Sequence, residues 1–416
     1  MKIFLALCLV ATALAVEDVL RGVLKSPRET LQLYGSFKAK EHLKYAASED
    51  RMRFRLFRAN AQFVASANEE ESGAVFGLNF FSAMTEDEKQ QYLGLNVTGH
   101  GENPFHVSSS PSKVPERILW TDSSQVTAVK NQGSCGSCWT FGAVGGLETR
   151  YQQVSGKLRN FAEQEYLDCV YEGSRNGCNG GWPSDCYEYS KKNGGRLAST
   201  ANYPYAAKDG SCTGSSRPDA MIAAKIIGFM DVSPSEKANI EALAEGSLSV
   251  AFQVTNYFQQ YRGGVINDNT CTGRPNHAVT AVGYTPSFVL VKNSWGSSWG
   301  DKGFVKFARG YPEDCGLFKY SSYPRLEATG VKDTHPKDAA TTYKPSEDDD
   351  VNPDPQPDPN CEDVAVNCEK YYCQWSNIAE KYCRKTCELC NDGDGGDCPS
   401  GTIRCDDGIC RHEHMC

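Results

Sequence analysis

The sequence predicts a mixed α+β fold within a chain of several domains. Its 416 residues exceed what one compact domain usually holds. Trp139 onward is patterned as a helix, whereas His277 to Tyr284 and Phe288 to Lys292 are apolar runs of strand length. Cysteines are absent from residues 16–113, and ten of the 19 fall in the last 56 residues. A helical N-terminal zone, a mixed central domain and a disulfide-rich tail are therefore expected.

The composition narrows the class of partner. The formal net charge is −9, which excludes a generally basic surface for nucleic acid and favours solvated acidic patches and tails. Residues 327–360 are rich in Pro and Asp and read as an extended linker, because they cannot bury enough apolar surface to order themselves. We expect no nucleic-acid partner, and protein or peptide ligands instead.

The N-terminus resembles a secretory signal. Lys2 precedes an apolar run from Ile3 to Leu14, and small residues at Ala13 and Ala15 predict cleavage after Ala15. The run is too short to cross a bilayer, and no other stretch comes close. The mature protein is then exported or lysosomal with no membrane span, and most of its cysteines should be paired.

The strongest chemical signal is the segment Asn131 to Trp139, which contains Cys138. A thiol attacks as its thiolate, and a helix N-terminus and a nearby imidazolium are two ways to lower its pKa. Glycines and serines form a turn before Cys138, so this residue should begin the helix. Gln132 could donate a side-chain N–H beside the Cys138 backbone N–H, forming an oxyanion hole.

A base must come from elsewhere in the chain. His277 leads one predicted strand and Asn293 ends the next, so adjacent strands could join Asn293 to one imidazole nitrogen and leave the other facing Cys138. Trp295 could cover that bond from water. Alone, Cys138 could be a disulfide partner, His277 a core histidine and Asn293 a turn residue. Their joint occurrence with Gln132 favours catalysis.

These motifs resemble the papain family of cysteine proteases. Cys135 to Trp139 matches the family's Cys-Gly-Ser-Cys-Trp signature, and His277 and Asn293 follow Cys138 by 139 and 155 residues. Residues 114–326 can be laid over a papain-like domain, which implies a helical left lobe, a β-barrel right lobe and a cleft between them. Cys178 to Gly181 resembles the glycine-rich wall of that cleft, where Gly180 and Gly181 would meet the substrate backbone.

The resemblance also implies a cysteine pairing. It joins Cys135 to Cys178, Cys169 to Cys212, and Cys271 to Cys315. Cys138 is then free for catalysis, and Cys186 remains as a buried thiol.

The zone before the enzyme resembles a cathepsin L-type inhibitory propeptide, spanning residues 16–113. Its motif residues recur every three or four positions, as one helical stripe requires: Glu49, Arg53, Phe57, Asn60, Val64 and Asn68. Ser36 to Asn68 as a whole reads helical. The resemblance implies a segment running backward through the cleft until cleavage near Ser112 or Val114. In the family, a motif after this helix contains an aspartate where this chain has Ala83. One titratable group is therefore missing, which weighs against release of the propeptide by acid.

Matching positions between this chain and the family implies which residues surround the specificity pocket. The pocket for the residue before the scissile one would be lined by uncharged residues, namely Trp182, Pro183, Ala251, Asn276 and Tyr320, with Trp295 nearby. An apolar substrate side chain is expected. Tyr320 either shortens the pocket, favouring Leu or Val over Phe, or packs in the core. No inserted cleft-blocking loop is seen around Cys169 to Gly181, so an endopeptidase is expected.

The tail contains two cysteine units. Residues 361–390 resemble a sea-anemone potassium-channel-toxin module, implying pairs Cys361–Cys390, Cys368–Cys383 and Cys373–Cys387, although sequence alone allows fifteen connectivities. Residues 391–416 resemble a truncated low-density-lipoprotein-receptor class A module without its acidic half, so no metal site is expected. The tail reads as an adhesive or targeting appendage with a possible extracellular target. Asn96 begins a glycosylation sequon.

Together these observations predict a secreted or lysosomal, monomeric cysteine endopeptidase made as a zymogen and needing no cofactor. Two other hypotheses remain. One is a non-catalytic binding protein on a protease scaffold, which the intact Cys138, His277 and Asn293 disfavour. The other is a bifunctional effector whose tail acts on a receptor.

Overall fold

The computed structural model describes residues 20, 22–69, 73–95, 114–170, 177–213, 221–271, 274–311 and 315–333, with two short strands at 403–404 and 410–411. It divides into two compact units, one of residues 27–346 and one of residues 1–26 with 347–416. The signal peptide, Asn96, Ser112, the linker beyond Asp333 and the paired cysteines predicted for the tail lie outside the described residues. In the second unit, β10 (Ile403–Arg404) pairs antiparallel with β11 (Cys410–Arg411).

The propeptide segment that the sequence predicted as one helix, Ser36 to Asn68, is divided between two helices. α2 (Pro27–Lys40) and α3 (Ala47–Ala67) are separated by a turn, so the prediction of a continuous helix from Ser36 was wrong. His42 has a left-handed φ of 54°, and the Leu43 amide returns to the Lys38 carbonyl at 2.8 Å, which ends α2. The two helices then pack on each other around Tyr34, Phe37 and Phe57.

The motif stripe on α3 is confirmed as its buried face. Arg53, Phe57, Asn60 and Val64 are all buried, and Asn68 at the C-terminal end exchanges hydrogen bonds with the Phe76 backbone. The stripe packs on η1 (Phe80–Ala83), and α4 (Glu86–Gln90) follows. β1 (Ala74–Phe76) pairs with β5 (Tyr261–Ile266) and so attaches the propeptide to the sheet of the catalytic domain.

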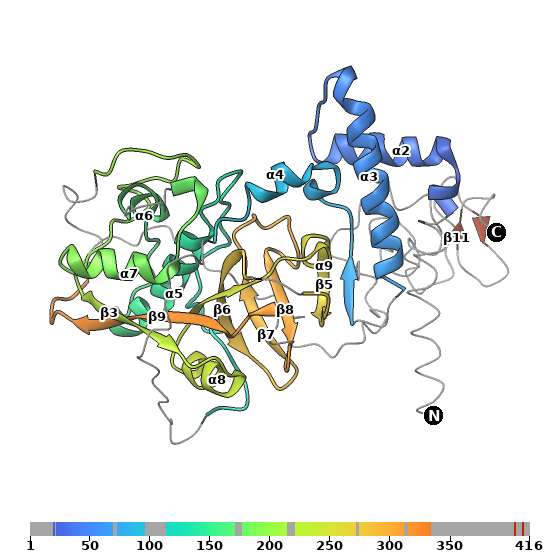
Figure 1. Ribbon diagram of the computed structural model, residues 1–416. Coiled ribbons are helices and arrows are strands. Elements are labelled where there is room, and N and C mark those ends of the chain that lie inside the picture. The colour runs from blue at the N-terminus through green and yellow to red at the C-terminus, as the bar shows by residue number, and fades with distance from the viewer. Residues whose placement is uncertain are drawn as a thin grey trace, which may run out of the picture. The chain divides into compact units, whose positions relative to one another are not determined.

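The catalytic domain has a helical lobe and a sheet lobe; in Figure 1 the helices of the first lie to the left and most strands of the second lie to their right. The helical lobe contains α5 (Cys138–Ser155), α6 (Glu163–Cys169), η2 (Gly177–Asn179) and α7 (Pro183–Lys192). Its core is aromatic and apolar, built around Trp139, Leu147, Tyr151 and Tyr187. The predicted helix beginning near Cys138 is therefore confirmed.

Three glycines weaken α5 intrinsically, and the structure explains them. A Cβ on Gly145 would lie 2.1 Å from Thr280 Oγ1, and one on Gly142 would lie 3.0 Å from Ser249 Oγ. A Cβ on Gly146 would meet Tyr187 Oη at 2.6 Å. The glycines thus allow α5 to approach the sheet closely, and packing compensates for their low helix propensity.

The sheet lobe is a nine-stranded sheet in the order β1-β5-β8-β7-β6-β4-β9-β3, with β2 paired to β6. The remaining elements are β2 (Ile118–Leu119), β3 (Ala224–Val232), α8 (Glu236–Ala244), β4 (Leu248–Phe252), α9 (Asn256–Gln259), β6 (His277–Tyr284), β7 (Phe288–Lys292), β8 (Phe304–Ala308) and β9 (Tyr320–Ala328). The prediction of a β-barrel was wrong in one respect, because β1 and β3 end the sheet and do not pair with each other among the described residues. The predicted strands at His277 and Phe288 are confirmed and lie adjacent.

The catalytic domain extends beyond the predicted boundary at Leu326. β9 continues to Ala328, and the Thr329 amide donates to the Ala223 carbonyl at 3.0 Å. Asp333 is buried and accepts hydrogen bonds from Arg159 Nε (3.0 Å) and Tyr151 Oη (3.1 Å). Residues 327–333 were assigned above to the linker. They are part of the folded domain, because the Asp333 carboxylate at their end is buried against the helical lobe.

Candidate active site

Cys138 is the first residue of α5 and is fully buried. Among the described cysteines between residues 114 and 333, only Cys138 and Cys186 are free. The others form Cys135–Cys178, Cys169–Cys212 and Cys271–Cys315, the pairs that the resemblance implied. Cys186 lies buried in α7 within the helical-lobe core. Cys138 alone of the two is at a helix N-terminus, where N–H groups converge on its sulfur.

His277 and Asn293 are joined by a buried hydrogen bond. His277 Nε2 and Asn293 Oδ1 are 2.9 Å apart, and Ser294 N donates to the same Oδ1 at 2.8 Å. Because Asn293 Oδ1 can only accept, Nε2 carries a proton and Nδ1 is the basic nitrogen. Nδ1 is buried and has no hydrogen-bond partner among the described residues. The next residue, Ala278, directs its backbone N–H at the Cys138 sulfur, so the strand that begins with His277 reaches the thiol.

Trp295 covers the bond between His277 and Asn293. Its ring centroid lies 4.7 Å from that of the imidazole, the two planes are tilted by 31°, and Trp295 is 1% exposed. Phe81 of the propeptide packs on the same ring at 4.7 Å. Trp295 therefore excludes water from the hydrogen bond and also serves as a docking surface for the propeptide.

Gln132 lies in the loop before Cys138 with its amide held from two sides. Its Nε2 donates to the carbonyls of Cys135 (2.9 Å) and Tyr92 (3.1 Å), and its Oε1 accepts from Ser294 Oγ at 2.6 Å. Since a hydroxyl donor fixes Oε1, the amide is oriented with its N–H groups toward the cleft. The Tyr92 carbonyl belongs to the propeptide. It accepts a hydrogen bond from Gln132 Nε2, the group that the sequence predicted to donate to an oxyanion.

The propeptide main chain crosses the cleft at Gly94. Its N–H donates to Cys138 Sγ at 3.3 Å, and its carbonyl accepts from Gly181 N at 2.9 Å. The Leu95 amide donates to the Asn276 carbonyl at 3.2 Å. One short segment thus contacts Cys138, the helical lobe and the sheet lobe together, which closes the cleft to any other peptide.

Burial shifts the pKa values of both Cys138 and His277. Burial raises the pKa of the Cys138 thiol to about 11, although N–H groups of Ala278 and Gly94 oppose the shift. Burial lowers the pKa of His277 to about 4, although its bond to Asn293 opposes that shift. At neutral pH the covered pair is therefore a neutral thiol and a neutral imidazole. A neutral thiol is the less reactive form of such a pair, because cysteine attacks as its thiolate.

The predicted pocket residues come from four elements that meet beside the cleft. Ala251 on β4 is in register with Tyr320 on β9 and with Ala278 on β6. Trp182 and Tyr320 pack edge to face at 5.6 Å. Pro183 is buried at the first turn of α7. Asn276 differs from the expectation, because its side-chain oxygen accepts from Val254 N at 2.9 Å and only its backbone carbonyl reaches the propeptide.

Sequence reasoning missed several residues of the site. Tyr92, Gly94 and Leu95 occupy the cleft, and Ser294 orients Gln132. No motif marks the first three, because their role depends on where the propeptide main chain runs. Ser294 lies next to the catalytic-site asparagine, and that proximity was the only available signal.

Comparisons with known proteins agree with this geometry. Residues 114–325 match the papain family cysteine protease profile, and residues 34–88 match the cathepsin propeptide inhibitor domain (I29). The chain belongs to the papain family of cysteine proteases.

Two curated relatives illustrate the similarity. An aleurain-like thiol protease of Arabidopsis thaliana is 37% identical over 328 residues, covering 74% of this chain and 88% of the relative. Mouse procathepsin L is 36% identical over 296 residues, covering 67% of this chain and 87% of the relative. Among solved structures, digestive procathepsin L2 of Tenebrio molitor superposes with a TM-score of 0.64 at 31% identity, covering 71% of this chain and 99% of that one.

This papain-family chain is a cysteine protease zymogen with a propeptide inhibitor domain, and its Cys-His-Asn site is the family's standard catalytic triad. Within the described part of the chain, no helix is both long and apolar enough to cross a membrane.

Proposed function

We propose that Cys138 is the nucleophile, His277 its general base and acid, Asn293 the residue that orients His277, and Gln132 a donor to the oxyanion. The observation that carries this assignment is the His277–Asn293 bond, which leaves Nδ1 unpartnered on the strand whose next N–H meets the Cys138 sulfur. Once the propeptide leaves, water reaches the site and the thiolate–imidazolium pair can form.

The reaction is acyl transfer. The Cys138 thiolate forms an S–C bond to the scissile carbonyl carbon while Gln132 Nε2 and the Cys138 N–H bind the oxyanion. The His277 imidazolium then gives its proton to the leaving amine as the C–N bond breaks. His277 next deprotonates a water, which attacks the thioester, and the carboxylate product and the thiolate are released.

The test uses the purified proform. After incubation in acid, peptidase activity should appear, be abolished by a thiol-alkylating epoxide, and be absent from Cys138→Ala. Cys186→Ala is the matched control, since it removes the other free thiol, and it should retain activity. An active Cys138→Ala protein would refute the assignment.

We further propose an apolar specificity pocket formed by Trp182, Ala251 and Tyr320. Tyr320 is half-buried and packs edge to face on Trp182, which supports a shallow floor. Substrates with Leu or Val before the scissile residue should then be cleaved faster than those with Phe. A fluorogenic panel in which Phe-Arg outperforms both Leu-Arg and Val-Arg would disprove this, and Tyr320→Ala should enlarge the pocket toward Phe.

The remaining proposals concern the whole precursor. We propose a monomeric endopeptidase, secreted or lysosomal, glycosylated at Asn96, with a tail (residues 361–416) that binds an extracellular target. Glycosylation of Asn96 is tested by treating the precursor with a glycosidase and comparing its mobility on a gel before and after. The role of the tail is tested by measuring binding of the isolated residues 361–416 to cell surfaces. The endopeptidase proposal depends on the lack of a cleft-blocking insertion around Cys169 to Gly181. Residues 171–176 of that segment lie outside the described ranges.

A further inference from the structure

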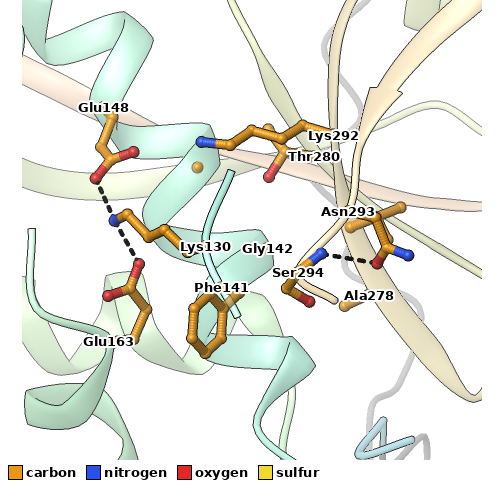
Figure 2. Close-up of a pocket in the computed structure, with 12 residues that line it drawn as sticks. Lys130, Phe141, Gly142, Glu148, Glu163, Ala278, Thr280, Lys292, Asn293 and Ser294 are labelled. Carbon is orange, nitrogen blue, oxygen red and sulfur yellow. Dashed lines mark hydrogen bonds and ion pairs between the residues drawn. The ribbon is translucent and has the colours of Figure 1, made fainter. Parts of the chain in front are cut away.

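Lys292, Asn293 and Ser294 are consecutive residues at the end of β7, and each contacts a different group. Asn293 binds His277 (2.9 Å) and Ser294 binds Gln132 (2.6 Å). The Lys292 side chain instead enters the interface between the lobes, toward α5 (Figure 2). This three-residue stretch therefore links both catalytic side chains to the interior of the lobe interface.

The interface contains a buried interlobe ion cluster, defined here as Thr127, Lys130, Glu148, Glu163 and Lys292. Lys130 Nζ lies between the carboxylates of Glu148 (2.7 Å) and Glu163 (2.6 Å), as Figure 2 shows. Lys292 Nζ donates to Thr127 Oγ1 at 2.7 Å, and that hydroxyl donates to Glu148 Oε2 at 2.5 Å. Two ammonium groups thus balance two carboxylates, which buried charges require.

Two segments contribute the lysines of this cluster, residues 130–132 and residues 292–296, and their backbones are also hydrogen-bonded to each other. Gly296 N donates to the Lys130 carbonyl at 3.0 Å, and Gln132 N donates to the Ser294 carbonyl at 2.8 Å. Each segment therefore contributes one lysine to the ion cluster and, within two residues, a side chain to the catalytic site. A shift of either segment would move the catalytic groups with it.

The surroundings leave little room for such a shift to be absorbed. The cavity beside the cluster is only about 20 Å³, lined by Lys130, Glu148, Glu163, Thr280 and Lys292. Gly145 and Thr280 also line this cavity, and they lie so close that a Cβ on Gly145 would be 2.1 Å from Thr280 Oγ1. Because packed interiors respond to lost contacts by displacement, removal of the Lys292 ammonium should be felt at Asn293.

We propose that Lys292 is a positioning residue for peptide-bond hydrolysis, whose link through Thr127 to Glu148 sets the position of Asn293 and Ser294 and thereby aims His277 and Gln132. The inference rests on the proposed roles of those residues. It requires no contact between Lys292 and the substrate.

The experiment compares activated full-chain variants with a Leu-Arg fluorogenic substrate. Lys292→Met keeps the length of the side chain without its charge, and Thr127→Val removes only the linking hydroxyl. Each should lower kcat about tenfold with KM changed less than about twofold, since small displacements of catalytic groups are costly. The double variant should be little worse than either single one, because both break the same link. Lys292→Arg, which keeps a cationic donor, should restore part of kcat.

Lys306→Met is the matched control, because Lys306 is a strand lysine paired with Asp301 outside the cluster. It should leave kcat unchanged. If Lys292→Met and Thr127→Val lower the melting temperature but not kcat, or if their effects on kcat simply multiply, the inference is wrong. If Lys292→Met does not fold, Thr127→Val alone decides between these outcomes. Activity of the wild type that persists in Cys138→Ala would instead refute the proposed function.

Discussion

At the scale of single residues, Gly94 is where the propeptide main chain passes the nucleophile. A Cβ at this position would lie 1.7 Å from the Gly136 carbonyl oxygen, a distance that no side-chain rotation can relieve. Gly94 N–H also donates to Cys138 Sγ. The propeptide main chain can therefore follow this route through the cleft only if residue 94 has no side chain. The hydrogen bonds of the propeptide to both lobes depend on that route.

Gly94→Ala should open the cleft of the unprocessed chain. We expect Cys138 to be alkylated by iodoacetamide at neutral pH at least about tenfold faster than in the wild-type proform, since a displacement costing about 1.4 kcal/mol has that effect. Gly35→Ala is the control, because a Cβ there meets nothing within 4 Å. Equal alkylation rates for wild type and Gly94→Ala would contradict the proposed path.

Gln132 shows how one side chain serves both states of the enzyme. In the zymogen its Nε2 binds the Tyr92 carbonyl, and in the active enzyme the same donor would bind the oxyanion. Gln132→Ala should therefore lower kcat by roughly 10²-fold while KM changes little, as loss of one oxyanion donor does elsewhere. Steady-state kinetics of the activated enzyme check this. A variant with a raised KM and an unchanged kcat would assign Gln132 to ground-state binding.

At the scale of elements, α3 and α4 are held together by one guanidinium. Arg53 donates to Glu49 Oε1 (2.7 Å), Glu88 Oε1 (2.6 Å) and the Ala83 carbonyl (3.0 Å). Ala83, which replaces the expected aspartate, thus contributes a backbone acceptor that does not titrate. Arg53 holds the pKa of Glu88 at about 2, below its usual value of 4.5.

The sign of the pH dependence follows from that shift. A carboxyl with a depressed pKa stabilises the folded propeptide above its unfolded pKa, and the contribution is lost as pH falls from about 4.5 toward 2. Activation of the proform should thus remain slow at pH 5 and accelerate below pH 4. Glu88→Gln should activate roughly tenfold faster at pH 5, the effect of about 1.4 kcal/mol, which is smaller than the full pKa shift because the Glu88 side chain is 36% exposed and solvent screens its charge.

The control for this prediction is Glu86→Gln. Glu86 is also on α4 but is exposed and pairs only with Lys89 in the described structure. Time courses of propeptide loss on gels, at several pH values, provide the measurement. Wild-type activation that is already complete within minutes at pH 5 would show that another group releases the propeptide.

At the scale of the whole molecule, residues 327–333 attach the C-terminal part of the catalytic domain to its helical lobe. Asp333 is buried with Arg159 and Tyr151, which are 174 and 182 residues away in the sequence. Any cleavage that removes the tail and leaves a stable enzyme should therefore lie beyond Asp333. The mass of the mature enzyme would locate its C-terminus.

Asp333→Ala should destabilise the catalytic domain by about 3 kcal/mol, because it leaves Arg159 without its buried carboxylate. Glu327→Ala removes the exposed pair with Lys225 and should cost less than about 1 kcal/mol. Melting temperatures of the two variants should differ accordingly. Similar values would mean that Asp333 contributes no more than a surface ion pair.

Much of this molecule was predictable from local chemistry. A thiol nucleophile, a base and its orienting amide must be Cys, His and Asn in recognisable surroundings, so Cys138, His277 and Asn293 could be proposed before any fold was known. The helical stripe of the propeptide and the strands at His277 and Phe288 follow from periodicity. Each helix, strand and motif among these features is encoded in a short local segment, although Cys138 and Asn293 are 155 positions apart.

What the sequence determined by itself is therefore the family and the kind of site, together with the residues proposed for it. Tertiary structure alone decided the open sheet, the turn between α2 and α3, the path of Gly94, the anchor at Asp333 and the cluster around Lys292. Apart from the local turn between α2 and α3, these features depend on strand register and on the approach of distant segments, 44 residues apart for Gly94 and Cys138 and 165 for Thr127 and Lys292. Residue type constrains such contacts only weakly, because many pairings of the same residues satisfy the same local preferences.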